Sequence, residues 1–379
     1  MRTMIATVST PPRPPSGRFD SLDMFRGLTV FMMIVVNSAE VGPLRHADWF
    51  GFTIADLVFP SFLFAVGNAM AFAFRREMTD AVFLKRVVRR GALIFLLGVL
   101  LYWYPFVMPH PDGGWTAKPF AETRLTGVLQ RIALCYMAAA VAVRFLTPRG
   151  LLWLSAVLLL GYWAVLVAFG PVGAAFSREG NVGNLVDLTL IGRDHLYVWD
   201  HGFDPEGVLG TFPAIVNVIA GYLVGRFLQR HGRDRAMVAR LAAVGAALVV
   251  AVLLWSPFFP IAKKLWTGSF VLLTVGLDML LLAGFVAWVE IGGHAHGRRF
   301  LGVFGRNPLA IYLFSELFIV TLNLIPIGGP AGFYAWIGTT VFQAIAPGPA
   351  GIVLRAVAYA LLCWAVGWWL DRRGVILKV

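Results

Sequence analysis

Long apolar runs of about twenty residues constrain this chain more than any other feature. An α-helix rises about 1.5 Å per residue, so about 20 apolar residues cross the roughly 30 Å hydrocarbon core of a bilayer. Such runs recur along all 379 residues, of which 59% are hydrophobic and only 14% charged. A soluble domain carries roughly 25% charged residues. We therefore expect an all-α polytopic membrane protein with about ten transmembrane helices.

The apolar runs also give the bounds of the expected spans. They are Asp23–Ala39, Ile54–Phe74, Val88–Tyr104, Thr126–Leu146, Leu151–Phe169, Val208–Leu228, Met237–Trp255, Trp266–Glu290, Phe300–Leu324 and Gly351–Leu370. The apolar stretch Phe333–Ile345 is shorter than a span requires, which favours an interfacial or re-entrant segment. Residues 1–20 are polar and rich in proline, so we expect a disordered cytoplasmic leader ahead of one transmembrane domain, 21–379.

Basic residues gather in alternate loops along the chain. One set of loops holds clusters such as Lys85 to Arg90, Arg226 to Arg240 and Arg298 with Arg299, whereas the other set is poor in lysine and arginine. The positive-inside rule then predicts that both termini are cytoplasmic. The loops beginning at Glu40, Pro105, Gly170, Ser256 and Pro326 are predicted to face outward. Orientation explains most of the net charge of +12, so we expect no nucleic-acid partner.

Polar residues are dense between Ser21 and Phe74. Asp23 and Arg26 share one helix face at the cytoplasmic entry of the first span, as an interfacial ion pair or as an anchor for an anionic ligand group. Asn37, at the outer end of that span, either bonds a neighbouring helix or belongs to a site. His46 follows in the outer turn. An imidazole there can take a proton near neutral pH, or it is simply solvated.

Ionisable residues inside apolar runs are costly, so each is a candidate for a functional role. Arg131 and Gln130 lie within the fourth expected span, and either face a ligand cavity or have a structural partner, Asp278 or Glu316 for the arginine. In the outer loop before the sixth span, Asp204 and Glu206 could recognise a sugar or an amine, or could begin a helix. The histidines are too scattered to predict a metal site.

Several segments resemble the transmembrane N-acetyltransferases related to heparan-α-glucosaminide N-acetyltransferase. They include SLDMFRG at Ser21–Gly27 and PLRHADWFGFTIADLVFPSFLF at Pro43–Phe64. Further matching segments follow in order: RLTGVLQRIALCY (Arg124–Tyr136), FDPEGVLGTFPAI (Phe203–Ile215), KKLWTGSFVLLTVG (Lys263–Gly276) and GRNPLAIYLFSE (Gly305–Glu316). One departure is Phe50, which stands where the family has an asparagine after the tryptophan.

The resemblance implies a function that composition alone does not. It implies an enzyme of a bacterial inner membrane that moves an acetyl group from cytoplasmic acetyl-CoA to the amine of a glucosamine-type sugar on the extracytoplasmic side. His46 matches the family's active-site histidine, as a base or a transient acetyl carrier, and Asn37 matches the asparagine of its site. No metal is implied, and a homodimer is one assembly that the resemblance allows.

The remaining site candidates follow from what such a reaction must bind. The phosphates of CoA suit cations near the cytoplasmic face, here Arg26, Arg75 and Arg76, with Arg131 and Gln130 placed better for the acceptor or the pantetheine arm. Carboxylates proposed for the acceptor or for orienting His46 are Asp48, Asp56, Asp204, Glu206 and Glu316. Three alternatives stay open: O-acetylation of envelope saccharide hydroxyls, a saccharide transporter or flippase, and a ligand sensor without turnover.

Overall fold

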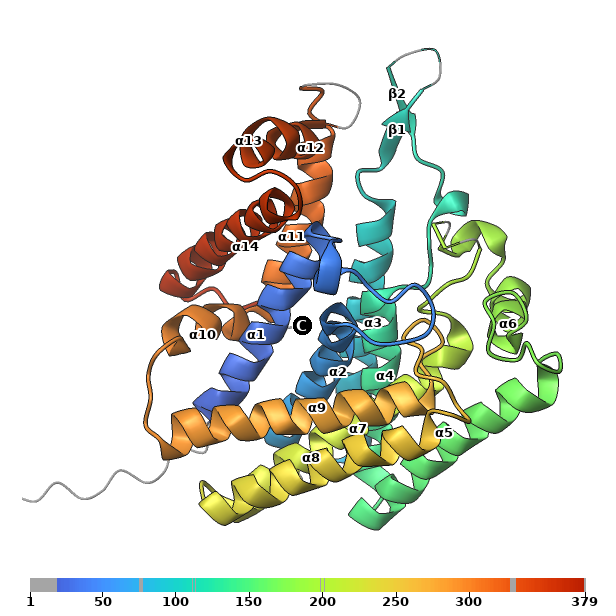
Figure 1. Cartoon of the computed structure of the whole chain (residues 1–379), viewed down its shortest axis with the longest axis vertical. Helices are drawn as coiled ribbons and strands as arrows, with labels where there is room; N and C mark the ends of the chain where they lie inside the picture. Colours follow the sequence, from blue (N-terminus) through green and yellow to red (C-terminus); the bar gives the residue numbers. More distant parts are fainter. Residues whose placement is uncertain are drawn as a thin grey trace, which may run out of the picture.

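A computed structural model describes residues 19–74, 78–110, 112, 114–197, 199–200, 202–327 and 332–377 of the chain. Its helices are α1 (Asp20–Ser38), α2 (Ile54–Ala73), α3 (Asp80–Trp103), α4 (Val128–Phe145), α5 (Pro148–Phe169), α6 (Val182–Leu190), α7 (Val208–His231), α8 (Arg235–Trp255), α9 (Gly268–Phe285), α10 (Arg298–Arg306), α11 (Pro308–Asn323), α12 (Gly332–Ile337), α13 (Gln343–Ile345) and α14 (Pro349–Arg372) (Figure 1). Nearly all of the expected leader lies outside the described residues, as do Arg75 and Arg76.

Shorter elements join these helices. A two-stranded antiparallel hairpin, β1 (Val107–Pro109) and β2 (Trp115–Ala117), follows α3. Three 3-10 turns are η1 (Gly42–Leu44), η2 (Phe120–Glu122) and η3 (Arg193–His195), and two π-helical segments are η4 (Val286–Ile291) and η5 (Gly338–Phe342). The stretch predicted to be interfacial or re-entrant forms α12, η5 and α13, none of which is long enough to cross a bilayer.

The described helices bear out the all-α polytopic prediction. Eight of them are long and apolar enough to cross a membrane: α1, α2, α4, α5, α7, α8, α9 with η4, and α14. A ninth crossing results if α10 and α11 are counted together. The remaining predicted span is α3, a helix of 24 residues whose first half carries Lys85, Arg86, Arg89 and Arg90. It is long enough to cross but carries more charged residues than the spans named above.

The prediction of one continuous helix over Phe300–Leu324 is wrong. The chain bends by 81° between α10 and α11. Asn307 lies at the bend with non-helical φ and ψ of −125° and 50°, and Pro308 is the first residue of α11. Proline disfavours helical geometry in the residue before it and cannot donate a backbone hydrogen bond, so the Asn307–Pro308 pair ends one helix and begins the next.

The interior of the bundle is built on the crossing of α2 and α7. A Cβ at Gly67 would lie 1.9 Å from the carbonyl oxygen of Val218, and a Cβ at Gly221 would lie 2.0 Å from that of Phe64. The two backbones therefore touch directly, as small residues allow in membrane bundles. Helices α1, α4 and α9 pack around this pair.

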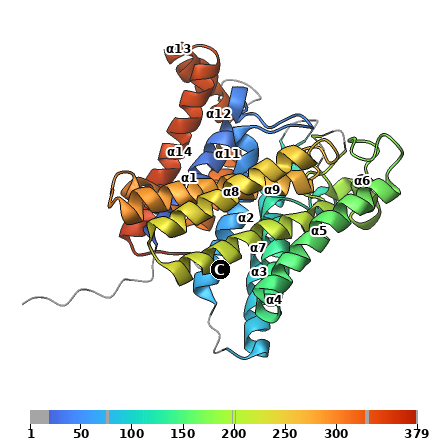
Figure 2. The ribbon, with the colours of Figure 1, turned by 60° about the horizontal axis from the view of Figure 1, so that its bottom comes forward.

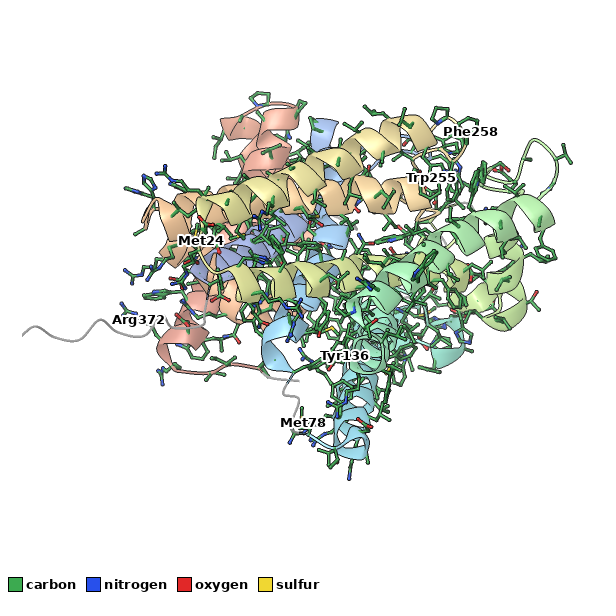
Figure 3. The ribbon with its side chains drawn as sticks, turned by 90° about the horizontal axis from the view of Figure 1, so that it is seen from below. Met24, Met78, Tyr136, Trp255, Phe258 and Arg372 are labelled. Carbon is green, nitrogen blue, oxygen red and sulfur yellow. The ribbon has the colours of Figure 1, made fainter. Side chains whose placement is uncertain are left out.

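The outer helices and loops surround this interior. Helices α5 and α8 bury little of their apolar surface, as lipid-facing spans do, and Figure 2 shows α8 lying alongside α9. The hairpin, α12 and α13 lie at the top of Figure 1 and α6 at its right, away from α10 at the left. In Figure 3, Trp255 and Phe258 lie on the opposite side of the molecule from Met24 and Arg372. The hairpin, α6, α12 and α13, which come from loops predicted to face outward, thus lie away from α10; which side of the membrane is cytoplasmic stays a prediction.

Candidate functional site

A cavity of about 510 Å³ lies at the C-terminal end of α1, called its outer end here because the distribution of basic residues predicts that it faces outward. Its wall is formed by the ends of α1, α2 and α3 and by the four loops that begin at Glu40, Pro105, Gly170 and Ser256. These are loops that the distribution of basic residues assigns to one face of the membrane. Polar lining residues include Asn37, Glu40, Arg45, His46, Asp48, Tyr102, Arg124, Tyr197, Asp200, Glu206, Lys263, Lys264 and Tyr312.

The carboxylate of Asp56, in the first turn of α2, holds the loop between α1 and α2 against the start of that helix. Asp56 Oδ2 accepts hydrogen bonds from the backbone N–H of Thr53 at 2.9 Å and of Ala47 at 3.2 Å. The first is the helix-capping bond that a Thr-x-x-Asp sequence favours. The N–H of Gly51 also donates to the carbonyl of Ile261 at 2.9 Å, which ties this loop to the α8–α9 loop.

The remaining oxygen of Asp56 holds His46. Nδ1 of His46 lies 2.9 Å from Asp56 Oδ1, and the carboxylate side chain is fully buried whereas the imidazole is 31% exposed. An ionised carboxylate can only accept hydrogen bonds, so Nδ1 carries the proton of a neutral ring. Nε2 is then the basic nitrogen. This is the arrangement that turns a histidine into a general base or a nucleophile.

Lys263, from the α8–α9 loop, completes the group around the imidazole. Its Nζ lies 3.0 Å from both ring nitrogens of His46 and 3.9 Å from Asp56 Oδ1, and its side chain is only 13% exposed. Burial lowers the pKa of Lys263 to about 8, although the Asp56 carboxylate opposes that shift. A histidine, a carboxylate and an amine from three segments thus meet at one point of the cavity wall.

Asn37 faces the same cavity from the last turn of α1. Its Nδ2 donates to Glu316 Oε1 at 2.9 Å, and Tyr312, one turn earlier on α11, also lines the cavity. Asn37 is exposed although most of α1 is buried, because the cavity opens beside it. The structure therefore brings His46 and Asn37, the two predicted catalytic residues, to one cavity.

The five carboxylates predicted to bind substrate have different positions. Asp56 orients His46, and Glu316 accepts from Asn37. Asp48 is exposed at the rim and pairs with the neighbouring arginine, whereas Glu206 is largely buried in the cavity wall. Asp204 is buried outside the cavity lining, and all of its bonds are to protein groups.

Arg124 joins two of these carboxylates and was absent from the predicted site. It donates to Asp204 through Nε at 3.1 Å and through a terminal nitrogen at 2.6 Å, and to Glu206 Oε2 at 2.6 Å. Burial alone would raise the pKa of Asp204, but the Arg124 guanidinium outweighs it and holds that pKa below its usual range. Arg124 also packs over the rings of Tyr102 and Tyr197. This buried cluster fixes the wall that faces His46.

The cations predicted for CoA are not brought together at this cavity. Arg131 is buried, donates to the carbonyl of Gly207 at 2.9 Å and lies over the Trp266 ring. The alternative that it pairs with Asp278 or Glu316 is therefore wrong. Gln130 is also buried, with no hydrogen-bond partner for its amide among the described residues.

Arg26 lies at the other end of α1 from Asn37. It donates to the carbonyl of Gly305 at 3.0 Å and lies 3.5 Å from Asp23, which agrees with the predicted ion pair. Neither Gly305 nor Asp23 lines the cavity, so these bonds do not place Arg26 in it. Its proposed part in binding an anionic group remains a prediction.

Lys263 is a second residue, besides Arg124, whose part in the site the sequence reasoning missed. It stands 217 residues after His46 in the chain, so no local spacing connects the two. A lysine pair, Lys263–Lys264, in an outer loop otherwise poor in basic residues was the available signal. Among the described residues, no group of three or more His, Cys, Asp or Glu is placed to hold a metal ion.

The fold and the site together define a polytopic, all-α membrane protein with a histidine–carboxylate pair in a polar cavity at one end of α1. The model of the catalytic region of heparan-alpha-glucosaminide N-acetyltransferases matches residues 18–254, more than half of the chain. The chain therefore belongs to the heparan-alpha-glucosaminide N-acetyltransferase family.

Curated relatives agree with this assignment. The chain is 27% identical over 363 residues to the heparan-alpha-glucosaminide N-acetyltransferase of Mus musculus, in an alignment covering 80% of this chain and 54% of the relative. The Homo sapiens protein of the same name is also 27% identical, with 80% and 53% covered. The chain thus spans about half the length of the curated relatives it matches.

Proposed function

We propose that this chain is a membrane acetyltransferase that moves an acetyl group from cytoplasmic acetyl-CoA to the amine of a glucosamine-type sugar on the extracytoplasmic side. The observation that carries the proposal is the His46–Asp56 pair at 2.9 Å on the wall of a cavity of about 510 Å³, in a chain of this family. The names of the curated relatives supply the reaction and the class of acceptor.

The chemistry needs a base, and His46 is suited to supply it. An amine that attacks a thioester must lose a proton, and Nε2 of a ring whose Nδ1–H is held by Asp56 can accept it. In the alternative route, Nε2 attacks the thioester carbon, the CoA thiol leaves, and the sugar amine then takes the acetyl group from the ring. Both routes use the same nitrogen and the same carboxylate.

Asn37 is suited to stabilise the tetrahedral intermediate. Its side-chain amide has two N–H donors, and one of them is used by Glu316. The second can donate to the oxygen that becomes negatively charged when the thioester or acetyl carbon is attacked. The carboxylates of the wall, Glu206 above all, are placed to accept hydrogen bonds from a sugar or from its ammonium group.

The proposed direction of transfer rests on the distribution of basic residues. Loops rich in arginine, predicted to be cytoplasmic, alternate with the four loops that line the cavity. A cysteine introduced at Arg45, whose side chain is largely exposed, tests this sidedness with a membrane-impermeant thiol reagent. Both natural cysteines, Cys135 and Cys363, are buried, so we expect little labelling of them by the reagent. Labelling only from the cytoplasmic side would overturn the proposed topology.

The activity is tested with purified protein in liposomes and acetyl-labelled acetyl-CoA. We expect label on glucosamine but not on N-acetylglucosamine, whose amine is already blocked. Label on both would indicate transfer to a hydroxyl group. Label on no acceptor, with folded protein and measurable saccharide flux across the membrane, would replace the enzyme by a transporter.

A further inference from the structure

We infer that Lys263 is a positioning residue that keeps His46 uncharged through its own charge. The inference deepens the acetyl transfer proposed above and rests on it for its functional meaning. The observation behind it is a short contact between the amine of Lys263 and the imidazole of His46. Each of these groups becomes a cation when it is protonated, and both are partly buried in the cavity wall. Nζ of Lys263 lies 3.0 Å from Nδ1 and 3.0 Å from Nε2 of His46.

The equal distances matter because they exclude a simple hydrogen bond. A donor on the lone-pair axis of one ring nitrogen lies much farther from the other nitrogen, since the two lone pairs point in different directions. Nζ lies off both axes, so its effect on the ring is mainly electrostatic. Nε2 keeps a lone pair directed away from Lys263, which is the lone pair that the proposed reaction uses.

The carboxylate of Asp56 and the ammonium group of Lys263 therefore have opposite effects on the protonation of the imidazole. The Asp56 carboxylate, 2.9 Å from Nδ1, favours the protonated ring, whereas an ammonium group on Lys263 disfavours it. The carboxylate by itself favours protonation of the ring, and a ring in its protonated form cannot act as a base. Lys263 offsets that tendency while Asp56 still fixes the ring.

Other titratable groups line the cavity that His46 faces, including the phenols of Tyr102 on α3 and Tyr312 on α11. On its own loop are Glu40, Arg45 and Asp48, and from α2 comes Asp56. Arg124 precedes α4, Asp200 and Glu206 precede α7, and Lys264 follows Lys263. Most of these are paired elsewhere: Arg45 with Asp48, Arg124 with Glu206, and Lys264 with Asp200. Lys263 is the cation in direct contact with the ring.

The ammonium form of Lys263 prevails at pH values below its own pKa. Burial lowers the pKa of Lys263 to about 8, so its charge persists below that pH and is lost above it. An ordinary histidine takes up a proton near pH 6.5, which is below that value. Lys263 therefore still carries its charge at the pH where an ordinary histidine becomes protonated.

The test is a direct titration of the His46 ring. Full-length protein with 15N-labelled histidine is followed by NMR in nanodiscs, and the His46 signal is assigned by its absence from His46→Gln. We expect Lys263→Gln and Lys263→Met to raise the pKa of His46 by about one unit. Lys263→Arg, which keeps the positive charge, should restore the wild-type value. Lys263→Met keeps a side chain of similar length, so a shift in that variant comes from the lost charge and not from lost bulk.

Lys264→Gln is the matched control. It removes the same charge from the next residue of the same loop, but Lys264 pairs with Asp200 at 2.9 Å instead of contacting His46. Its shift should be smaller than that of Lys263→Gln. Equal shifts for the two variants, or no shift in Lys263→Gln, would overturn the inference.

The rate of acetyl transfer gives a second readout. In Lys263→Gln, the acidic limb of the pH profile should move to higher pH by the same amount as the ring titration, with Lys263→Arg close to wild type. Wild-type protein without any acetyl transfer would sink the proposed function but not the coupling, which the NMR titration measures by itself. A shifted titration with an unmoved acidic limb would overturn the role of Lys263 in the reaction.

Discussion

The two ends of α1 carry similar polar residues but use them differently. At the outer end, Asn37 and the following loop with His46 face a cavity of about 510 Å³. At the N-terminal end, predicted to be the inner end, the Arg26 guanidinium donates to the carbonyl of Gly305 beside the bend between α10 and α11. The polar residues of the outer end thus line a cavity, whereas Arg26 links α1 to that bend.

Neighbouring groups make the inner end a structural joint. Arg306 pairs with Asp371 of α14 through two of its nitrogens. Asn307 donates from its side chain to the carbonyl of Val375 at 2.8 Å and accepts from the N–H of Leu377 at 3.1 Å. These bonds hold the bend against the end of α14 and the residues that follow it, while the carbonyl of Gly305, which has no helical partner at the bend among the described residues, accepts from Arg26. The difference between the two ends can be tested by mutation.

The largest effect is expected at the outer end, from His46→Ala. Removing the base should slow acetyl transfer by about 10²- to 10⁴-fold, the usual contribution of a general base, while the protein stays folded. His110→Ala is the control, because His110 is an exposed loop histidine beside Asp112. Initial rates with labelled acetyl-CoA measure the change. Activity above about a hundredth of wild type would argue against a role as base.

A smaller loss is expected from Asp56→Asn. The amide keeps the shape of the carboxylate but no longer fixes the proton on Nδ1, so transfer should fall by roughly 10²-fold, the low end of what a general base contributes. The thermal midpoint should also fall, because the bond to the N–H of Thr53 caps α2. Asp48→Asn, at the exposed rim of the same cavity, is the comparison. An equal loss in both variants would contradict the assignment of Asp56 as the orienting residue.

A still smaller effect is expected from Asn37→Ala, about 10-fold on the rate of transfer. The loss stays below that of a sole oxyanion donor because other polar groups line the cavity. The expected change is in kcat, with little change in KM for the acceptor. Kinetics identical to wild type would remove Asn37 from the site and leave it as the partner of Glu316.

At the inner end, the expected effect is on stability and not on transfer. A Cβ at Gly27 would lie 1.9 Å from the carbonyl oxygen of Leu301, so Gly27→Ala must push α1 and α10 apart. We expect a cost of about 1–3 kcal/mol, seen as a lower thermal midpoint in detergent. Gly161→Ala, in α5 with nothing within 4 Å of the added atom, should show no such loss. An unchanged midpoint in Gly27→Ala would contradict the close contact.

The sequence predicted the helices well because apolar length is a local property. It failed at Asn307–Pro308, where the apolar run continues through a bend of 81°. Hydropathy averages over a window and does not register the geometry of a single residue before proline. The pair was visible in the sequence, and the same rule that explains the bend could have predicted it.

Part of the site was also predictable, because several of its residues lie close together in the sequence. His46, Asp56 and Asn37 stand within one stretch, so local reasoning together with the resemblance found them. Lys263 and Arg124 reach the cavity only because loops from distant helices fold over it. Arg131 was a reasonable candidate for a ligand contact, yet its guanidinium packs on Trp266 instead. Which helices meet was not encoded in any short pattern.

The single carboxylate of Asp56 has two structural roles. Its oxygens cap the first turn of α2 and hydrogen-bond the ring of His46, and the N–H of Asp56 donates to the carbonyl of Thr53. The imidazole cannot swing out of place while that turn stays closed, and an unwinding of the turn would release it. The orientation of the His46 ring therefore depends on whether the first turn of α2 stays folded. Hydrogen exchange at the Asp56 amide can follow the opening of that turn.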